Sequence, residues 1–259
     1  MGIGDEVMCA GEAARLAAGT SRRYMMLDKN RNPKWHFVWD GNPNVARPGH
    51  QHDGVVAYGS NGRRVYIEDE TTDRRKFREY HPYPATLVLP PNVAKLTEQA
   101  RGKIIFNPSI KDRASPGKRW PLQSWKSLTM LGREFEWLEI GDSSAGRFCN
   151  SAFLQTGHFW SACALLRGAR AVVTHEGALH HAAAALGTPC VVIRGGFISP
   201  RVTGYAGQVD LYVEDERWPL GCGMRIYCQH CVDAMKSITP AAVLAALKDL
   251  LARNAKEAA

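Results

Sequence analysis

The stretch Ala171-Val172-Val173-Thr174-His175-Glu176-Gly177-Ala178-Leu179-His180-His181 decides the fold of this chain. Ala171–Thr174 predicts a buried strand, Gly177 a tight turn, and the small residues from Ala178 onward a helix. After that helix, Cys190–Arg194 is apolar enough for a second buried strand. A strand, a glycine turn, a helix and another strand in this order predict one unit of a parallel α/β sheet.

The same alternation runs through the second half of the chain. We expect strands at Ile104–Phe106, Phe135–Ile140, Ala171–Thr174 and Cys190–Arg194, and helices at Leu122–Leu131, Phe159–Leu166 and Ala178–Leu186. Short, uniformly apolar strands separated by helices are typical of a parallel sheet that is covered on both faces. Such sheets bind ligands beyond the carboxyl ends of their strands, so a site is expected there.

The first half of the chain has a different pattern, which predicts a smaller domain. A helix over residues 5–17 is followed by expected strands at Tyr24–Leu27, His36–Trp39, Val55–Tyr58 and Ala85–Leu89. Pro90-Pro91-Asn92 marks the boundary between a first domain, residues 1–98, and a second domain, residues 99–238. Residues 239–259 form a last amphipathic helix that could cross back to the first domain.

The composition of the 259 residues indicates a soluble globular protein, with 45% apolar and 22% charged residues. No apolar stretch approaches the roughly 20 residues of a membrane-spanning helix, which argues against membrane insertion. The first residues, Met1–Glu6, lack the features of a secretory signal, which favours a cytoplasmic location and reduced cysteines. The net charge of +8 favours a polyanionic partner such as nucleic acid, phosphorylated lipid or a nucleotide.

Several features around the deciding stretch occur together in one known family. They are Gly177, His180, the Ala182–Ala185 run, Gly187-Thr188-Pro189 and the loop Gly195-Gly196-Phe197-Ile198-Ser199-Pro200. This pattern resembles the donor-binding motif of glycosyltransferase family 9, the ADP-heptose heptosyltransferases. The sequence departs from the family at His175-Glu176, where the family has Asp-Thr. Because groups at this turn lie near the donor phosphates and sugar, the departure leaves the sugar open.

A second set of residues, upstream of this stretch, is similar to the same family. Ser109 follows an expected strand, and Lys118 stands two residues before Trp120-Pro121. The resemblance implies that Lys118 binds the donor diphosphate, where a cation offsets the charge of the leaving group. A surface lysine beside a helix start is the alternative. Gln155 is the nearest counterpart of the glutamate that holds the ribose in the family.

The start of the chain, Gly2-Ile3-Gly4-Asp5-Glu6-Val7, is similar to the N-terminal loop of the family. The strand that precedes this loop in the family has no counterpart here. The resemblance implies that Asp5 is the general base that takes a proton from the acceptor hydroxyl, and Glu6 is a second candidate. The competing role of Asp5 is to cap the helix that it opens.

Together these matches imply an α/β fold of the GT-B type, in which two Rossmann-like domains face a cleft and the N-terminal one is reduced. The implied reaction is inverting transfer of a sugar from a nucleotide-diphosphate sugar to a hydroxyl, with no catalytic metal expected. The residues expected to bind the donor are Ser109, Lys118, Gln155, Glu176, Gly177, His180, Gly195 and Gly196.

The acceptor has three open interpretations. The small first domain and the basic charge favour a polyanion, and we expect DNA that carries a 5-hydroxymethyl pyrimidine, as in phage-type glycosyltransferases. The resemblance to heptosyltransferases gives the alternative of a lipopolysaccharide or another surface glycan. A protein that binds a sugar nucleotide or nucleic acid without catalysis is the alternative from another class. The oligomeric state stays open.

Cys222, Cys228, His230 and Cys231 have a spacing compatible with a structural zinc ion, which takes four such ligands. Only one Cys-x-x-Cys pair is present, so free thiols are the alternative. A zinc-protease motif is excluded, because its two histidines lie four residues apart on one helix face. In the stretch His175–His181, the first two histidines, His175 and His180, are five residues apart.

Overall fold

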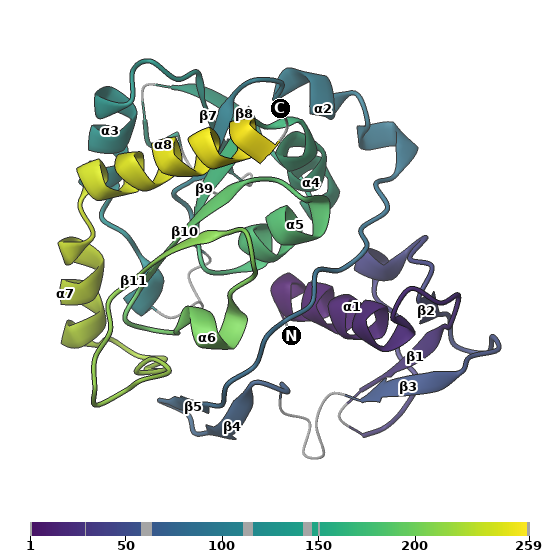
Figure 1. Cartoon of the computed structure of the whole chain (residues 1–259). Helices are drawn as coiled ribbons and strands as arrows, with labels where there is room; N and C mark the ends of the chain where they lie inside the picture. The colour runs from purple at the N-terminus through teal and green to yellow at the C-terminus, as the bar shows by residue number, and fades with distance from the viewer. Residues whose placement is uncertain are drawn as a thin grey trace.

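The computed structural model describes residues 2–28, 30–57, 64–110, 116–141, 147–149 and 151–257. Within these residues, the second half of the chain forms a parallel sheet of six strands in the order β11-β10-β9-β6-β7-β8 (Figure 1). The strands are β6 (Ile104–Asn107), β7 (Trp137–Gly141), β8 (Ala152–Gln155), β9 (Ala171–His175), β10 (Cys190–Gly195) and β11 (Val209–Tyr212). The expected parallel α/β sheet is confirmed.

Both faces of this sheet are buried, because successive residues of a strand point to opposite sides. In β6, Ile104 and Phe106 belong to one apolar cluster and Ile105 to another. The first face is covered by α3 (Leu122–Leu131), α7 (Gln229–Ser237) and α8 (Pro240–Glu257), and the second by α4 (Phe159–Gly168) and α5 (Ala178–Leu186). Burial of one such side chain contributes about 1.5–3 kcal/mol, so strands that are apolar at every position stabilise both layers.

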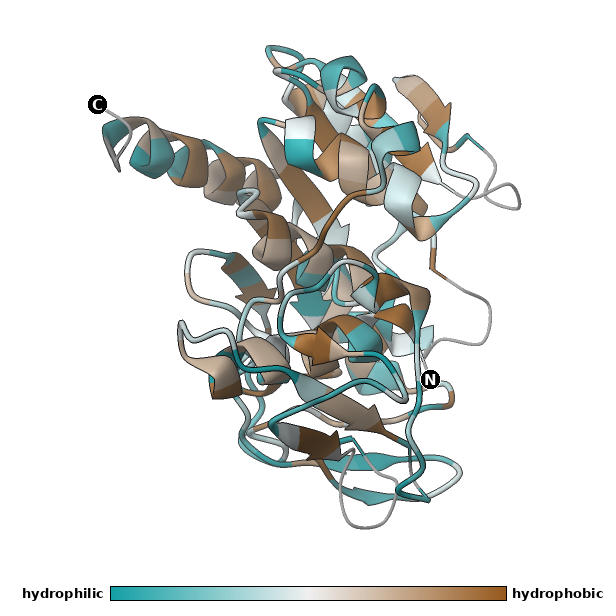
Figure 2. Ribbon diagram, turned by 90° about the vertical axis from the view of Figure 1, so that its right-hand side faces the viewer, coloured by the Kyte–Doolittle hydropathy of each residue, from teal (hydrophilic) through white to brown (hydrophobic). Residues whose placement is uncertain are grey.

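The last helix, α8, lies on the large sheet beside α3 (Figure 1). Its buried side chains Val243, Leu247 and Leu250 belong to the same apolar cluster as Ile104. Figure 2 shows apolar and hydrophilic residues alternating along this helix up to the C-terminus, as expected for a helix with one buried face. The apolar face of the helix thus packs on the second domain.

The first domain is a parallel sheet of three strands in the order β2-β1-β3, with helix α1 beside it. Its elements are α1 (Ile3–Ala17), β1 (Tyr24–Leu27), the 3-10 helix η1 (Phe37–Trp39), β2 (Val45–Ala46) and β3 (Gly54–Ala57). α1 also packs along α5, so it lies between the two domains (Figure 1). The reduced N-terminal domain is confirmed.

Two of the strands expected in the first domain are wrong. Most of His36–Trp39 forms the 3-10 helix η1, because the His36 ring caps the turn and Trp39 points inward, where its indole N–H donates to the Glu6 carbonyl. Ala85–Leu89 pairs with no described strand. Its alternate buried side chains join the apolar cluster around α1 and α4 instead.

An antiparallel hairpin of the first half, β4 (Ile67–Glu70) and β5 (Arg75–Phe77), packs on the second domain. The Arg75 amide donates to the Gly223 carbonyl at 2.9 Å. Figure 1 shows the hairpin below the short helix α6 (Pro200–Thr203), whose Val202 belongs to the same apolar cluster as Ile67 and Phe77. The division expected after residue 98 therefore does not describe the packing of this hairpin.

The remaining described helical elements are short turns. They are η2 (Pro91–Val93), α2 (Leu96–Gln99), η3 (Pro116–Lys118) and α6 (Pro200–Thr203). Among the described helices, none combines the length and the hydropathy that crossing a bilayer requires.

Replacement of Gly11 by Ala is expected to destabilise the protein. Gly11 lies within α1, where a Cβ would come within 2.0 Å of the Tyr83 carbonyl oxygen. Alanine ordinarily stabilises a helix relative to glycine by about 0.5–1 kcal/mol. A loss of about 1–3 kcal/mol in urea unfolding is expected instead, because the segment around Tyr83 packs directly on α1. Gly157→Ala is the control, since a Cβ there meets nothing within 4 Å; equal effects of both changes would contradict this packing.

Candidate active site

The residues assigned to the donor site by sequence come from the carboxyl ends of four strands of the large sheet. Ser109 follows β6, Gln155 ends β8, Glu176 follows β9 and Gly195 ends β10. The carboxyl ends of parallel strands lie at one edge of a sheet, where α/β proteins bind their ligands. The structure therefore brings these residues to the expected edge.

The N-terminal ends of α1 and α5 meet at this edge. A Cβ on Gly4 would lie 2.9 Å from the His181 ring and 3.4 Å from the Ala178 amide nitrogen. The absence of a side chain at Gly4 thus allows the two helix ends to approach each other. Helix N-termini carry free amides and a partial positive charge, so their junction favours a negatively charged group.

Glycine is required at the turn between β9 and α5. Gly177 has φ 157° and ψ −160°, a combination that other residues rarely adopt, and a Cβ there would meet nothing within 4 Å. The buried His180 ring holds the turn from inside: Nδ1 accepts the Gly177 N–H at 2.9 Å, and Nε2 donates to the Thr203 carbonyl at 2.9 Å. His180 thus shapes the turn. Because its ring is buried, it can act on a donor only by positioning Gly177.

His175 holds the turn that carries Lys118. Its Nε2 accepts the Trp120 backbone N–H at 3.1 Å. Burial, followed by the charges of Lys118 and Arg119, lowers the pKa of His175 to about 3. The ring is therefore neutral, as an acceptor must be, and it fixes η3 beside the end of β9.

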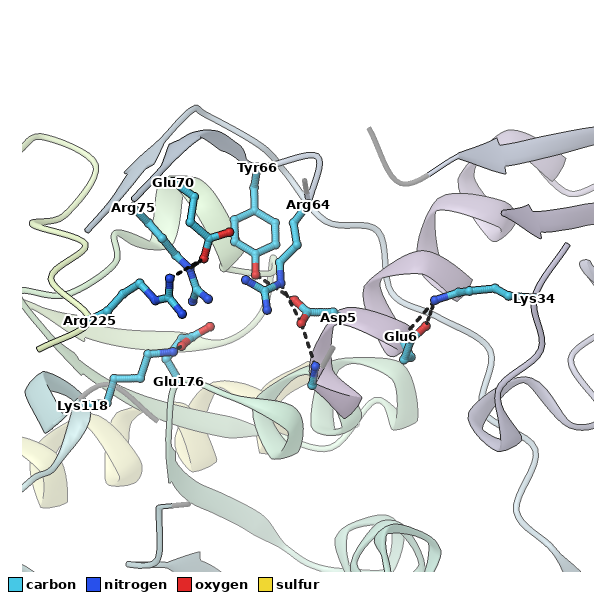
Figure 3. A network of polar contacts seen from close by, with 11 residues as sticks. Asp5, Glu6, Lys34, Arg64, Tyr66, Glu70, Arg75, Lys118, Glu176 and Arg225 are labelled. Carbon is cyan, nitrogen blue, oxygen red and sulfur yellow. Dashed lines mark hydrogen bonds and ion pairs between the residues drawn. The ribbon is translucent and has the colours of Figure 1, made fainter. Parts of the chain in front are cut away.

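Lys118 and Glu176 form an ion pair at the start of α5 (Figure 3). Burial opposes the ionisation of Glu176, yet the Lys118 ammonium and the Arg194 guanidinium hold its pKa below the usual range. The ammonium also lies 4.7 Å from the centre of the Phe197 ring. An anionic ligand at this point would compete with Glu176 for Lys118.

Asp5 has several partners at the start of α1 (Figure 3). Its carboxylate accepts the Gly2 amide at 3.1 Å and the Tyr66 hydroxyl at 2.8 Å, and it pairs with Arg64 at 2.8 Å. The bond to Gly2 is the helix cap considered for this residue. Burial and the Asp5 charge raise the pKa of Tyr66 well above its usual value, so the Tyr66 hydroxyl stays protonated and donates.

Glu6 points away from this network, toward the first domain (Figure 3). Its carboxylate accepts two hydrogen bonds from the Lys34 ammonium, at 3.0 and 2.8 Å. Its backbone carbonyl accepts the Trp39 indole N–H. The two candidate bases are thus separated, and it is Asp5 that lies in the network with groups of the donor side.

The β4–β5 hairpin contributes charges that sequence analysis missed. Arg75 pairs with Glu70 at 2.8 Å, and Arg225, which precedes α7, pairs with the same carboxylate at 3.2 Å. The Arg64 charge acts on Glu70, and the Glu176 charge acts on Tyr66, so these pairs belong to one network (Figure 3). Arg64 and Arg75 each follow another arginine in the sequence, which resembles dispersed surface charge, and Arg225 stands between Met224 and Ile226 with no basic neighbour.

Arg194 lies beneath the site, fully buried in β10. Its guanidinium pairs with Asp210 at 2.5 Å and donates to the Thr203 hydroxyl at 2.7 Å. Burial, followed by the Arg194 charge, lowers the pKa of His180 to about 4, which keeps that ring neutral. Sequence analysis did not single out this arginine, which forms a buried ion pair with Asp210 below the strand ends.

Gly195 and Gly196 are explained by packing against α7. Gly195 has a φ of 59°, and a Cβ there would lie 2.9 Å from Met235. A Cβ on Gly196 would lie 2.5 Å from the His230 ring. Both glycines let α7 approach β10, so a donor contact is not needed to account for them.

Ser109 and Gln155 differ in their surroundings. The Ser109 hydroxyl is buried and has no hydrogen-bond partner among the described residues. Such a group costs about 1–3 kcal/mol when nothing pairs with it, so it points to a ligand that would. Gln155 is exposed at the end of the edge strand β8, where solvent or a ligand can reach its amide.

Two groups of described residues have the geometry of metal ligands. Donor atoms of Glu176, His180 and His181 lie within 4.8 Å of one another, but each side chain already has a protein partner. Glu176 binds Lys118, and the His181 Nδ1 lies 2.8 Å from the Tyr205 hydroxyl. This group is a hydrogen-bonded part of the core. The second group is the Cys222, Cys228, His230 and Cys231 set at the start of α7.

Solved glycosyltransferase structures share this arrangement of elements. The glycosyl transferase family 9 protein from Veillonella parvula DSM 2008 has a TM-score of 0.64 at 13% identity, over 98% of this chain and 95% of that chain. The iron-containing dodecameric glycosyltransferase TibC from enterotoxigenic E. coli H10407 has 0.59 at 14% identity, over 96% and 76%. E. coli heptosyltransferase WaaC with ADP has 0.53 at 13% identity, over 99% and 96%.

The chain has the GT-B-like fold of these glycosyltransferases. At 13–14% identity the likeness establishes the fold alone. No family model matches the sequence, and no curated protein matches it either. None of these three structures is described as a DNA-modifying enzyme, so the phage-type DNA acceptor expected from the charge receives no support from this GT-B-like fold.

We expect the protein to lose stability as the pH falls from about 6.5 to about 4.5. Burial lowers the pKa of His175 to about 3, that of His180 to about 4, and that of His181 well below its usual value. In this window the unfolded chain binds protons that the folded chain excludes. Each histidine therefore favours unfolding by about 1.4 kcal/mol for every pH unit that is lost.

Urea unfolding across this pH range measures the effect. His175→Gln should flatten the pH dependence by about a third, because one of the three buried rings is gone. His50→Gln removes an exposed histidine and should leave the dependence unchanged. Constant stability across the range would contradict the neutral, buried state of these rings.

Proposed function

We propose that this chain is a glycosyltransferase that moves a heptose-type sugar from a nucleotide-diphosphate donor to a hydroxyl of a glycan. The observation that carries the proposal is the junction of α1 and α5. There Asp5 of the first domain lies in one network with Lys118 and Glu176 of the second. In a GT-B-like fold, transfer between domains requires a proton acceptor on one side and an anion-binding group on the other.

The donor diphosphate is proposed to bind at the start of α5. Lys118 and the helix amides both favour an anion there. The open surface at Gly177 admits a ligand close to the backbone, and the Ser109 hydroxyl offers a further hydrogen bond. Because the diphosphate gains charge as the sugar leaves, these groups stabilise the transition state more than the bound donor.

An adenosine diphosphate sugar is the donor that we propose. WaaC has been solved with ADP, and TibC in complex with ADP-D-β-D-heptose. Gln155 is proposed to bond the ribose hydroxyls, in place of the glutamate that the family resemblance implies. A neutral amide binds hydroxyls more weakly than a carboxylate does, because charge-assisted hydrogen bonds are the stronger ones.

Asp5 is the proposed general base. In an inverting transfer it removes the proton of the acceptor hydroxyl while that oxygen attacks the anomeric carbon, and the bond from the sugar to the diphosphate breaks. Arg64 and Tyr66 hold the carboxylate in one orientation for this step. General base catalysis contributes typically about 10²–10⁴-fold to a rate.

The acceptor is proposed to bind over the first domain. A pocket of about 470 Å³ there is lined by Arg23, Trp35, Trp39 and Arg47, among others. Arginines bind phosphate and carboxylate groups through paired hydrogen bonds, so an anionic glycan such as a lipopolysaccharide core suits this pocket. DNA that carries a 5-hydroxymethyl pyrimidine has in its favour the net charge of +8 and the small first domain, which suit any polyanion, and we do not propose it.

A thermal-shift series with nucleotide diphosphates tests the donor site. ADP at a hundred times its Kd should stabilise the protein by about 2.7 kcal/mol. For a chain of this size that raises Tm by several degrees, at about 2–4 °C per kcal/mol. UDP and GDP should have smaller effects. No shift with any of them would contradict the site, and a larger shift with UDP or GDP would contradict the choice of adenosine.

The same series on a Lys118 variant locates the binding. Lys118→Met, combined with Glu176→Gln so that no buried carboxylate is left unpaired, should abolish the ADP shift and lower kcat/KM about a hundredfold. Lys103→Met is the matched control, because Lys103 pairs with Glu136 at the opposite end of β6. Loss of binding in the control alone would place the donor elsewhere.

Asp5→Asn tests the base. Turnover of an ADP-sugar should fall by about 10²–10⁴-fold while the ADP shift is kept, because the amide keeps its place but accepts no proton. Glu6→Gln changes the neighbouring carboxylate, which is held by Lys34, and should leave kcat unchanged. Unchanged turnover in Asp5→Asn would contradict the general-base role and leave Asp5 only the role of helix cap.

A further inference from the structure

Four possible metal ligands gather at the start of α7, outside the proposed donor site. Cys222 comes from the loop after β11, and Cys228, His230 and Cys231 come from the first turn of α7. One donor atom of each lies within 4.8 Å of the others. Ligands about 2.0–2.3 Å from a tetrahedral zinc ion lie roughly 3.3–3.8 Å from one another, so small side-chain rotations would bring the four donor atoms onto one ion.

The orientation of His230 is that of a metal ligand. Its Nδ1 faces the Cys231 sulfur at 3.9 Å, and its Nε2 pairs with the Asp215 carboxylate at 3.2 Å. Metal-bound histidines almost always give their second nitrogen to a carboxylate, a carbonyl or water, which fixes the ring and its tautomer. Gly196 makes room for the ring, because a Cβ there would lie 2.5 Å from the His230 Cε1.

The thiols of this group lie together, unlike the others. Cys222 and Cys231 are fully buried with their sulfurs 2.9 Å apart, and Cys228 is half-buried in the same cluster. The cysteines assigned to the other apolar clusters are Cys9, Cys149, Cys163 and Cys190. Among the described groups with metal-ligand geometry, this is the one that contains thiols, the ligands that structural zinc prefers together with histidine.

The loop that carries Cys222 stands between the β10–α6 loop and the hairpin. The Cys222 amide donates to the Gly196 carbonyl at 3.0 Å, and the Gly223 amide donates to the Phe197 carbonyl at 3.0 Å. On its other side, the Gly223 carbonyl accepts the Arg75 amide at 2.9 Å. An ion bound to Cys222 would therefore fix one loop against both neighbours.

We propose that Cys222, Cys228, His230 and Cys231 bind one zinc ion, which holds the β4–β5 hairpin on the second domain. Four protein ligands complete a tetrahedral zinc site and leave no position for a substrate, so the ion is structural. Since the hairpin carries Glu70 and Arg75 to the charged network, a zinc ion that fixes the hairpin also stabilises that network without contacting it. This proposal is independent of sugar transfer.

Metal analysis of the full chain tests the site. The protein, purified in reducing buffer without added metal or chelator, should contain about one zinc ion per chain. Cys228→Ser should lose most of the zinc, whereas Cys163→Ala, a change in another cluster, should keep it. Cobalt(II) exchanged into the unaltered chain should give the visible absorption of a tetrahedral thiolate complex, a readout that needs no variant to fold.

Hydrogen exchange before and after zinc removal tests the structural role. The amides of Arg75, Cys222 and Gly223 should lose protection, because their hydrogen bonds join the loop to the hairpin and the β10–α6 loop. Amides of β1 should keep theirs. This readout does not involve donor or acceptor, so it can fail while sugar transfer holds.

Three results would overturn the proposal. Zinc at a small fraction of the chain concentration, with Cys222 and Cys231 joined by a disulfide in mass spectrometry, would remove the site. Iron at full occupancy would overturn the identity of the ion. Unchanged exchange at Arg75 after zinc removal would overturn its role in holding the hairpin.

Discussion

The packing of α1 on α5 is the contact on which the rest of the structure depends. α1 belongs to the first domain, yet its N-terminus reaches the start of α5 because Gly4 has no side chain. The contact carries the carboxylate of Asp5 to the carboxyl edge of the large sheet. With His180 holding the turn from inside, the outer side of Gly177 is left open at the same place.

Charges at this junction come in pairs. Asp5 has Arg64, Glu70 has Arg75 and Glu176 has Lys118, and each pair is shielded from solvent to a large extent. Removal of one partner from a buried pair costs about 3–5 kcal/mol, because a charge is left uncompensated. A ligand that takes the place of Glu176 beside Lys118 avoids this cost only where the displaced carboxylate pairs with another cation of the network. Binding at this junction is then an exchange of partners within an existing network.

The sequence predicted the elements whose pattern is local. β6, β9 and β10 are apolar except near their carboxyl ends, and α5 is alanine-rich, which left little ambiguity. β8 is half-exposed, β11 contains Asp210, and the buried positions of α7 are Cys231, Ala234 and Met235, so none of the three was predicted. His36–Trp39 was wrong because a side-chain cap overrode strand propensity.

The site was predictable where it lies on one strand-turn-helix unit and not where tertiary contacts assemble it. Lys118, Glu176 and Gly177 stand in or near a motif, and the structure does bring them together. Arg64 and Tyr66 reach Asp5 across about sixty residues of chain, with no local pattern to mark them. The roles of Gly195 and Gly196 depend on α7, which no strand-helix rule places opposite them.

The hairpin has a consequence for how the chain acquires its structure. β5 hydrogen-bonds to the loop at Gly223, so a segment made early has its partner some 150 residues later, and Arg74 forms a bridge with Met224. Contacts of such long sequence separation slow folding, because the chain loses the entropy of closing a long loop before these contacts stabilise it. During synthesis the apolar side chains of Ile67 and Phe77 lack most of their packing partners until the last quarter of the chain has emerged. A cut anywhere between these points would separate β5 from the loop that it hydrogen-bonds, so neither piece would keep all of its contacts.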